Sequence, residues 1–206
     1  MNTTIYLIRH TQTIGNVEKR LTGWKEYDLT EQGEKYVKQL NKELENIKFD
    51  IAYCSSSSRT RKTIQEIANK NGIPIIQDEN LNEMYFGIYD GWKWEDVNIV
   101  NPQIKKMHEE TNEIKGIKEQ EKTEEVAKRM YKCILNIVRN NIGKTILICS
   151  HGVAIEAFLR EVTGEPFTKK REEYSQKNTS INIVKFNEET QKFYVEVLNS
   201  TKHIDL

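Results

Sequence analysis

Two stretches decide the fold: TIYLIRHT at residues 4–11 and TILICSHG at residues 145–152. Each begins with an apolar run typical of a buried strand, and each run is followed within two residues by a histidine, His10 or His151. In open α/β sheets, ligands bind beyond the carboxyl ends of the strands. The two stretches therefore predict that two imidazoles lie in one crevice.

Strand-like and helix-like segments alternate along the rest of the chain. Apolar residues at helical spacing predict helices after Thr30, at about 58–70, after a cap at Thr123 and at 152–162. Further strands are expected at 49–54, 74–76, 180–186 and 193–198. This alternation is typical of an α/β protein, and we expect a three-layer α/β/α sandwich around a mostly parallel sheet.

The 206-residue chain is expected to form one domain, residues 1–206, with one insertion. Residues 10–29 are polar and are expected to be a long loop. Residues 93–122 are strongly charged and are interrupted by proline and glycine, so they are expected to form a small helical cap inserted in that domain.

Composition excludes several classes of function. The 31 basic residues balance 31 acidic ones, so a nucleic-acid partner is not expected and any anion site has to be a local cluster of cations. The three cysteines form neither a disulfide framework nor a zinc pattern. No signal peptide and no apolar stretch near the roughly 20 residues of a membrane span is visible. We therefore expect a cytoplasmic protein without a membrane partner.

Several known sequence motifs of phosphate-binding and phosphate-transferring sites are matched only in part. IGKT at 142–145 resembles the end of a P-loop, but the required first glycine falls on Val138, and the motif precedes a strand. The cysteine-phosphatase spacing of a cysteine, five residues and an arginine occurs from Cys133 to Arg139, in an apolar helical run that cannot form a phosphate loop. The histidines form neither HxH nor HExxH, so no metal is expected.

A third strand end supplies a further cation. The strand FDIAYC at 49–54 runs into SSSSRTRKT, which places Arg59 where a helix begins. Free amides at a helix N-terminus favour anions, and arginine adds a fork of donors. Arg9, Arg59 and the two histidines are then expected to surround a phosphoryl group without a metal. The predicted chemistry is phosphoryl transfer, which depends mostly on positioning and charge stabilisation.

Such a reaction needs a nucleophile and an acid. A neutral histidine can attack phosphorus, provided that its other ring nitrogen is held by a hydrogen-bond acceptor. Glu83 lies in the unusual stretch LNEMYFGIYDGW at 81–92 and is the candidate acid. A carboxyl group in an aromatic-rich, partly dry pocket can keep its proton near neutral pH.

The order of these motifs resembles that of the histidine phosphatase superfamily, the phosphoglycerate mutase-like family, over nearly the whole chain. Arg9-His10-Thr11 resembles the family's Arg-His-Gly opening, with threonine in place of glycine. LNEMYFGIYDGW resembles the Leu-x-Glu…Phe-Gly-x-x-Glu-Gly pattern, with Asp90 in place of glutamate. Four other stretches also resemble family motifs: LTGWKEYDLTEQG at 21–33, SSSSRTRKT at 55–63, CSHGVAI at 149–155 and LNSTKHI at 198–204.

The resemblance implies roles for individual residues. His10 would be the nucleophile that carries a transient phosphoryl group, and Glu83 would donate a proton to the leaving group. The phosphate oxygens would be held by Arg9, Asn16, Arg59 and His151, and His151 is also counted among the catalytic residues. Further candidates for the substrate pocket are Thr22 and Gly23. No metal or organic cofactor is implied.

The resemblance leaves phosphatase and mutase as alternatives. Mutases of this family carry a longer insertion after the acid-bearing stretch, with an arginine pair that binds the substrate carboxylate. Residues 92–122 carry no such pair, although they contain lysines, among them Lys105, Lys106, Lys115 and Lys118. The sequence therefore favours a metal-independent phosphomonoester phosphatase that acts on a small phosphorylated metabolite, with a cofactor-dependent phosphoglycerate mutase as the alternative.

A third alternative is a non-catalytic binding module, which would predict the loss of a catalytic position. The positions concerned are all occupied as the family requires: His10, Arg59, Glu83 and His151. The oligomeric state stays open, with a homodimer as one alternative.

The chain is expected to turn beside the first histidine. Arg9 and His10 would point to opposite sides of an ideal strand, so the backbone has to leave strand geometry for both to reach one phosphate. Thr11 stands where the family has glycine, so the turn has to form with a β-branched residue, and backbone strain at this position is the first feature to check.

Overall fold

The computed structural model describes residues 2–111, 113–168 and 171–204. Its centre is a six-stranded mixed sheet with the order β3-β2-β4-β1-β5-β6. The pairs β3-β2, β2-β4 and β4-β1 are parallel, and β5 is antiparallel to both β1 and β6. The strands are β1 (Asn2–Arg9), β2 (Ile51–Cys54), β3 (Ile75–Gln77), β4 (Thr145–Ser150), β5 (Ile181–Asn187) and β6 (Lys192–Ser200).

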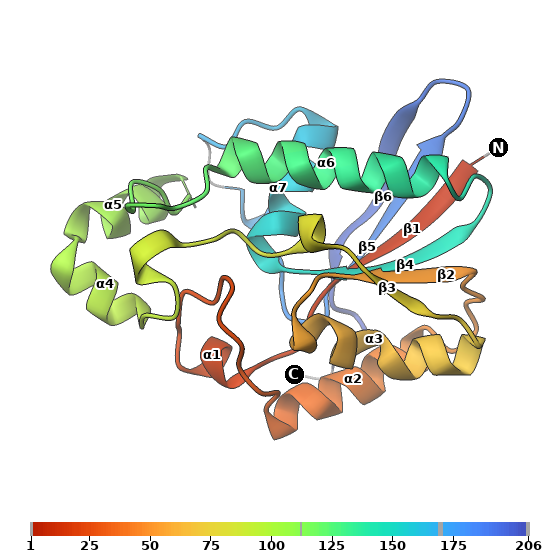
Figure 1. Cartoon of the computed structure of the whole chain (residues 1–206), viewed down its shortest axis with the longest axis horizontal. Helices are drawn as coiled ribbons and strands as arrows, with labels where there is room; N and C mark the ends of the chain where they lie inside the picture. The colour runs from red at the N-terminus through yellow and green to blue at the C-terminus, as the bar shows by residue number, and fades with distance from the viewer. Residues whose placement is uncertain (1, 112, 169–170, 205–206) are drawn as a thin grey trace.

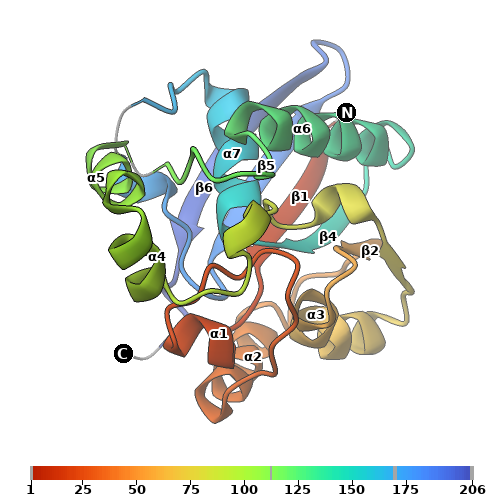
Figure 2. The same cartoon turned by 60° about the vertical axis from the view of Figure 1, so that its left-hand side comes forward.

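Helices cover both faces of the sheet, which confirms the predicted α/β class (Figure 1). On one face lie α6 (Thr123–Arg139) and α7 (Gly152–Thr163), and on the other lie α2 (Glu31–Glu43) and α3 (Ser58–Asn71). Three helices gather beyond the carboxyl ends of the parallel strands, where Figure 2 brings them forward: α1 (Ile14–Val17), α4 (Trp94–Val100) and α5 (Pro102–Thr111).

Burial on both faces explains why the two decisive stretches are apolar without alternation. On β1, Ile5 and Leu7 belong to the core beneath α6 and α7, whereas Ile8 belongs to the core with α2 and α3. The register continues this division into β4, because Ile5 pairs with Ile146 and Leu7 with Ile148. Each such side chain stabilises the fold by roughly 1.5–3 kcal/mol when fully buried. The core therefore fixes where both strands end.

Two local predictions differ from the structure. The stretch expected to be a long loop contains α1, because the Thr13 hydroxyl accepts the Asn16 N–H at 3.3 Å and the Asn16 side chain accepts the Thr13 N–H at 3.0 Å. The prediction that Thr123 caps a helix is wrong by one residue. Thr123 is the first residue of α6, and Lys122 is the cap, its N–H donating to the Glu125 carboxylate at 3.0 Å.

Residues 93–122, of which all but residue 112 are described, contain α4 and α5 followed by a segment without regular structure. This region lies at the carboxyl ends of the strands (Figure 1). Three short 3₁₀ turns complete the elements: η1 (Glu79–Leu81), η2 (Gly87–Tyr89) and η3 (Glu172–Tyr174). Among the helices of the described chain, none has both the length and the apolar character needed to cross a bilayer.

Candidate active site

The strand register places the two histidines of the decisive stretches side by side. Arg9 pairs with Ser150, so the residues that follow β1 and β4 are His10 and His151. The His10 N–H donates to the Ser150 carbonyl at 3.0 Å, and the two ring centroids are 5.2 Å apart. Both side chains are buried. The parallel pairing of two strands thus brings together residues that are 141 positions apart in the sequence.

The chain turns after Arg9 without placing Thr11 in the left-handed region, so this threonine in place of glycine causes no such strain. Thr11 is not among the described residues with positive φ. Its N–H donates to the Thr63 hydroxyl at 3.0 Å, and its own hydroxyl donates to the Gly33 carbonyl at 2.7 Å. The threonine therefore contributes a hydrogen bond that glycine could not make.

A strained backbone conformation occurs instead at Thr179, in the segment that hydrogen-bonds to Arg9 and His10. Thr179 has a φ of 55°, in the left-handed region that β-branched residues disfavour. Its N–H donates to the Arg9 carbonyl at 3.1 Å. The neighbouring Asn178 side chain donates to the His10 carbonyl at 3.1 Å. The segment before β5 thus fixes the backbone of both residues.

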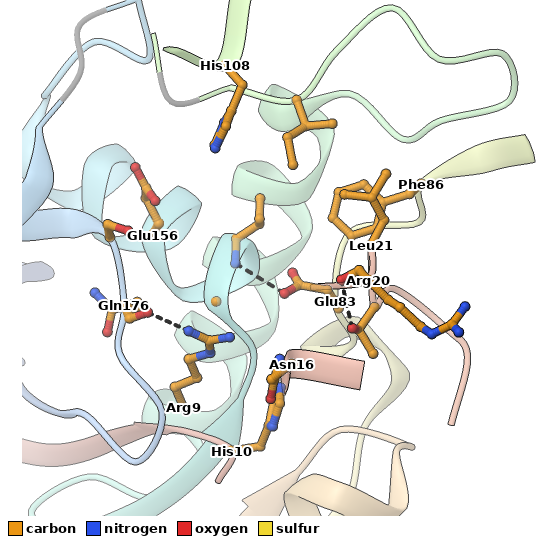
Figure 3. Close-up of a pocket in the computed structure, with 15 residues that line it drawn as sticks. Arg9, His10, Asn16, Arg20, Leu21, Glu83, Phe86, His108, Glu156 and Gln176 are labelled. Atoms are coloured by element: carbon orange, nitrogen blue, oxygen red, sulfur yellow. Dashed lines mark hydrogen bonds between the residues drawn. The ribbon is translucent and has the colours of Figure 1, made fainter. Parts of the chain in front are cut away.

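A cavity of about 240 Å³ opens at this end of the sheet (Figure 3). Five of the predicted site residues line it: Arg9, His10, Asn16, Thr22 and Glu83. Three other predicted site residues are not among its lining residues: Gly23, Arg59 and His151. The cavity therefore gathers part of the predicted set, and the remaining members lie beside it.

His10 is held in a defined tautomer. Its Nδ1 lies 2.7 Å from the carbonyl oxygen of Thr11. A carbonyl can only accept, so Nδ1 carries the hydrogen and Nε2 carries the lone pair. Burial lowers the pKa of His10 well below its usual range, and the positive charges of Arg59 and Arg9 lower it further. The imidazole is therefore neutral at neutral pH, the form that a nucleophile needs.

Two donors beside His10 can bind phosphate oxygens. The Arg9 guanidinium donates through Nη1 to the Gln176 carbonyl at 2.5 Å and lies against the start of α7. Burial lowers the pKa of Arg9, an effect that the Glu83 carboxylate opposes. The Asn16 side-chain oxygen accepts from Thr13 and from Asn178, so its NH₂ group is the part that can donate to a ligand.

Glu83 is held at the N-terminus of α7. Its Oε1 accepts from the N–H groups of Met84 and Ala154, each at 2.9 Å, and its Oε2 accepts from Val153 N–H at 3.2 Å. Burial raises the pKa of Glu83 above that of an ordinary glutamate, although these three N–H groups and Arg9 oppose the shift. Oε1 is the more fully engaged oxygen, so Oε2 is the better position for a transferable proton.

Arg59 and His151 lie behind His10. The fully buried Arg59 side chain donates to the carbonyls of Gly23 at 2.8 Å and Lys25 at 3.0 Å, and to His151 Nδ1 at 3.0 Å. Because a guanidinium only donates, His151 carries its hydrogen on Nε2, which lies 2.8 Å from the Ser55 hydroxyl. Burial, with the charge of Arg59, lowers the pKa of His151 well below its usual range.

Asp90 anchors the loop that Arg59 contacts, a role that motif reasoning did not identify. Its carboxylate accepts from the N–H groups of Gly23 at 2.9 Å, Trp24 at 3.1 Å and Lys25 at 3.1 Å. A Cβ on Gly23 would lie 2.2 Å from Asp90 Oδ1, which explains the glycine. The only sequence signal was an acid two residues before Trp92, at a position where the family has glutamate.

Other lining residues belong to no motif that the sequence displays. They include Arg20, His108, Glu156 and Gln176, which come from four separate parts of the chain. Only the packing of the segment after α1, of α5, of α7 and of the segment before β5 brings them to one cavity. Within the described residues, no group of three or more histidine, cysteine, aspartate or glutamate side chains is arranged to hold a metal ion.

Comparison with known proteins agrees with this geometry. The profile of the histidine phosphatase superfamily (branch 1) matches residues 5–201. The 2,3-bisphosphoglycerate-dependent phosphoglycerate mutase of Mesorhizobium japonicum is 30% identical over 178 residues, which cover 80% of this chain and 84% of the mutase. The structure of Bacillus stearothermophilus YhfR matches with a TM-score of 0.90 at 28% identity, covering 98% of this chain and 100% of that one.

A phosphoserine phosphatase from Entamoeba histolytica also shares the fold. Its structure matches with a TM-score of 0.83 at 24% identity, covering 98% of this chain and 99% of that one. At this identity the likeness concerns the fold alone. Chains of the same architecture thus include both a mutase and a phosphatase.

Proposed function

The chain belongs to the histidine phosphatase superfamily, and we propose that it is a metal-independent phosphomonoester phosphatase that forms a phosphohistidine on His10. Family membership establishes phosphatase or mutase chemistry. The observation that carries the proposal is the bond of 2.7 Å between His10 Nδ1 and the Thr11 carbonyl, in a cavity that Arg9 and Glu83 also line. That bond makes Nε2 the nucleophilic nitrogen.

The reaction proceeds in two steps. Nε2 of His10 attacks phosphorus, the bond from phosphorus to the ester oxygen breaks, and the leaving alkoxide takes the proton of Glu83. The Glu83 carboxylate then accepts a proton from water as the water oxygen attacks the phosphohistidine, which releases phosphate and restores His10. Arg9 and Asn16 hold the phosphoryl oxygens. Removal of one such donor typically lowers the rate about 10²–10³-fold.

Arg59 and His151 supply the remaining donors in this proposal. Their present bonds, to the 22–25 loop, to Ser55 and to each other, are exchanged for bonds to the phosphoryl group. Thr22 lines the cavity and faces the substrate, whereas Gly23 serves by letting the backbone approach Asp90. Arg9 and Arg59 stay protonated through both steps, because a guanidinium keeps its proton in proteins.

Two observations bear on the choice between phosphatase and mutase. None of the lysines of the 93–122 segment is among the described residues that line the cavity, to which this segment contributes His108 and Ile114. A mutase has to retain a phosphoglycerate by its carboxylate, so the absence of these cations from the wall favours a phosphatase. The second candidate, phosphoglycerate mutase, is favoured by the name of the relative from Mesorhizobium japonicum.

We further propose that the substrate is a small phosphorylated metabolite and that the enzyme works in the cytoplasm. The balance of 31 basic and 31 acidic residues supports a site that recruits neither nucleic acid nor membrane. The three cysteines are unpaired and buried, which supports a reducing compartment.

A phosphate-release screen over common phosphomonoesters tests this function, with 3-phosphoglycerate and 2,3-bisphosphoglycerate included. We expect net phosphate release that is unchanged by EDTA. Isomerisation of phosphoglycerate without net release would establish the mutase instead. Loss of activity in EDTA would contradict the metal-independent mechanism.

A further inference from the structure

The acid of the proposed reaction lies in a part of the chain that has no regular structure. Glu83 follows the turn η1 and precedes η2, and residues 82–85 belong to neither a helix nor a strand. Its side chain lines the cavity, as Figure 3 shows. Because no helix or sheet fixes the backbone at this residue, hydrogen bonds from other groups have to do so.

Arg129, on α6, binds the main chain of this segment. Its Nη1 donates to the carbonyls of Asn80 and Asn82, each at 2.8 Å. Its Nη2 donates to the carbonyl of Glu83 itself at 3.1 Å. One guanidinium therefore holds the chain at the acid and at two positions just before it.

A carboxylate holds Arg129 in turn. The Nε and Nη2 groups of Arg129 donate to the two oxygens of Glu121, at 2.6 and 2.9 Å. Both side chains are mostly buried, with 19% of Arg129 and 20% of Glu121 exposed. All five N–H donors of the guanidinium are thus used, two on the carboxylate and three on main-chain carbonyls. A bidentate pair of this kind fixes the plane of the guanidinium.

Glu121 also bonds directly to the chain after the acid. Its N–H donates to the Tyr85 carbonyl at 3.0 Å, and its Oε2 accepts from the Tyr85 N–H at 3.4 Å. Glu121 comes from the end of the 93–122 segment, whereas Arg129 comes from α6. The pair therefore holds the backbone on both sides of Glu83.

The Glu83 carbonyl has one further donor among the described contacts. Trp24 Nε1 donates to it at 3.1 Å, from a side chain that is 58% exposed. Arg129 is charged and better shielded from water, and hydrogen bonds from charged donors are the stronger ones. Of the two donors, Arg129 is therefore the one expected to determine where Glu83 lies.

Resting on the proposed function, in which Glu83 is the acid, we infer that Arg129, fixed by Glu121, is a positioning residue for Glu83. A displacement of about 1 Å in a catalytic group can lower a rate about 10²-fold. Arg129 is not among the described residues that line the cavity, so it acts on the reaction through the backbone of Glu83.

Arg129→Lys tests this role, because it keeps the charge and removes the planar fork of five donors. The kcat for an alkyl phosphate is divided by the same variant's kcat for p-nitrophenyl phosphate, so that loss of folded protein cancels. We expect this ratio to fall about tenfold or more, since only the alkyl leaving group needs the proton of Glu83. An unchanged ratio would overturn the inference.

A matched control is available on the same helix. Arg139→Lys makes the same change at an exposed position of α6, where the arginine donates to the Gln191 side chain. We expect the ratio of this variant to equal that of the wild type. A fall as large as that of Arg129→Lys would show a general effect of substitutions in α6 and would overturn the inference.

A double variant distinguishes positioning of the acid from wider structural damage. If Arg129 acts through Glu83, then Arg129→Lys should lower the ratio no further in a chain that already carries Glu83→Gln. Losses that multiply in the double variant would mean that Arg129 acts by another route. Should Arg129→Lys fail to fold, Glu121→Gln takes its place in both measurements, because it weakens the bonds that orient the guanidinium while keeping the shape of the side chain.

The outcomes separate this inference from the proposed function. A ratio lowered by Glu83→Gln but not by Arg129→Lys would contradict the positioning role alone. A ratio that Glu83→Gln leaves unchanged would contradict the acid itself, and a wild-type protein that hydrolyses neither ester would contradict the proposed phosphatase.

Discussion

At the scale of single residues, the site depends on which protons His10 and Glu83 hold. Burial moves the two pKa values in opposite directions, lowering that of His10 and raising that of Glu83. A neutral nucleophile and a protonated acid therefore coexist over a wider pH range than free histidine and glutamate would allow. The hydrogen bonds from His10 to Thr11 and from α7 to Glu83 keep both groups in position.

The pH dependence of kcat/KM for an alkyl phosphate follows from these shifts. We expect activity to persist below pH 6.5, because the His10 pKa lies well below the usual value of about 6.5 and the imidazole stays neutral there. We expect it to fall as pH rises through the raised pKa of Glu83, where the acid is lost. An acid limb centred on the usual histidine value, after correction for substrate ionisation, would contradict this assignment.

Substitution of Glu83 should affect leaving groups unequally. Glu83→Gln removes the transferable proton, so hydrolysis of an alkyl phosphate should slow by about 10²–10⁴-fold, whereas p-nitrophenyl phosphate, which needs no protonation, should slow far less. The exposed Glu79→Gln provides the matched control. Equal losses on both substrates, measured by steady-state kinetics, would argue against Glu83 as the acid.

The sequence predicted the position of a residue correctly where that residue ends or follows a buried strand. Arg9, His10 and His151 lie where the strand ends predicted, because burial of the preceding residues leaves little freedom. The hydrogen bond from the Thr11 hydroxyl to the Gly33 carbonyl could not be predicted, because it spans 22 residues and no local pattern reveals it. The catalytic roles of these residues remain predictions.

At the scale of elements, the site is completed by the loop of residues 22–25. This loop is held by hydrogen bonds rather than by burial in the hydrophobic core. Residues 22–25 contribute no buried hydrophobic side chain to the core. The buried Leu21 immediately precedes them. Asp90 accepts their N–H groups, and Arg59 donates to their carbonyls. The loop thus lies between the Asp90 carboxylate and the Arg59 guanidinium.

Removing the negative charge of Asp90 should weaken the hydrogen bonds that hold residues 22–25. Asp90→Asn replaces one accepting oxygen by a donor, so at least one loop N–H loses its partner, at a cost of about 1–3 kcal/mol in the free energy of unfolding. We expect a lower thermal midpoint and a raised KM. Asp96→Asn, at an exposed position of α4, is the matched control. Equal thermal midpoints of the two variants would contradict the anchoring role of Asp90.

Long elements were predictable and short ones were not. Helices α3 and α7 begin and end within about one residue of the predicted 58–70 and 152–162, and α2 and α6 begin within one residue of their predicted caps, because apolar spacing and caps such as Thr30 and Gly72 define them. Helix α1 was missed, since four residues carry no periodicity and its start depends on the reciprocal bonds of Thr13 and Asn16. Yet α1 is the element that supplies Asn16 to the cavity.

At the scale of the whole molecule, keeping two neutral histidines buried reduces stability in acid. The folded-state pKa values of His10 and His151 lie well below their usual range because of burial, so below about pH 6.5 the unfolded chain binds protons there that the folded chain does not. Stability therefore rises with pH through this window, and it is lost as pH falls. Each histidine contributes up to about 1.4 kcal/mol per pH unit.

Removing one histidine should make the free energy of unfolding depend less steeply on pH. We expect the free energy of unfolding of His10→Asn to vary with pH less steeply than that of the wild type, by up to about 1.4 kcal/mol per unit below pH 6.5. Urea unfolding at several pH values measures both slopes. Identical slopes would show that His10 titrates alike in the folded and unfolded states, against the assigned neutral imidazole.

The whole-molecule arrangement set the limit of what the sequence could predict. Alternating strands and helices predicted the three layers, and ordered motifs predicted most of the residues at the carboxyl edge of the sheet. Glu156 and His108 could not be placed, because their convergence depends on how α5 packs relative to α7.

The central claim is that His10 carries the phosphoryl group, and trapping the intermediate tests it most directly. Wild-type enzyme is mixed with a labelled phosphomonoester, quenched within the first turnover and assayed for protein-bound phosphate. We predict label that is labile in acid and stable in base, as a phosphohistidine is, and no label in His10→Ala. Label that persists in His10→Ala, or that survives acid, would contradict the claim.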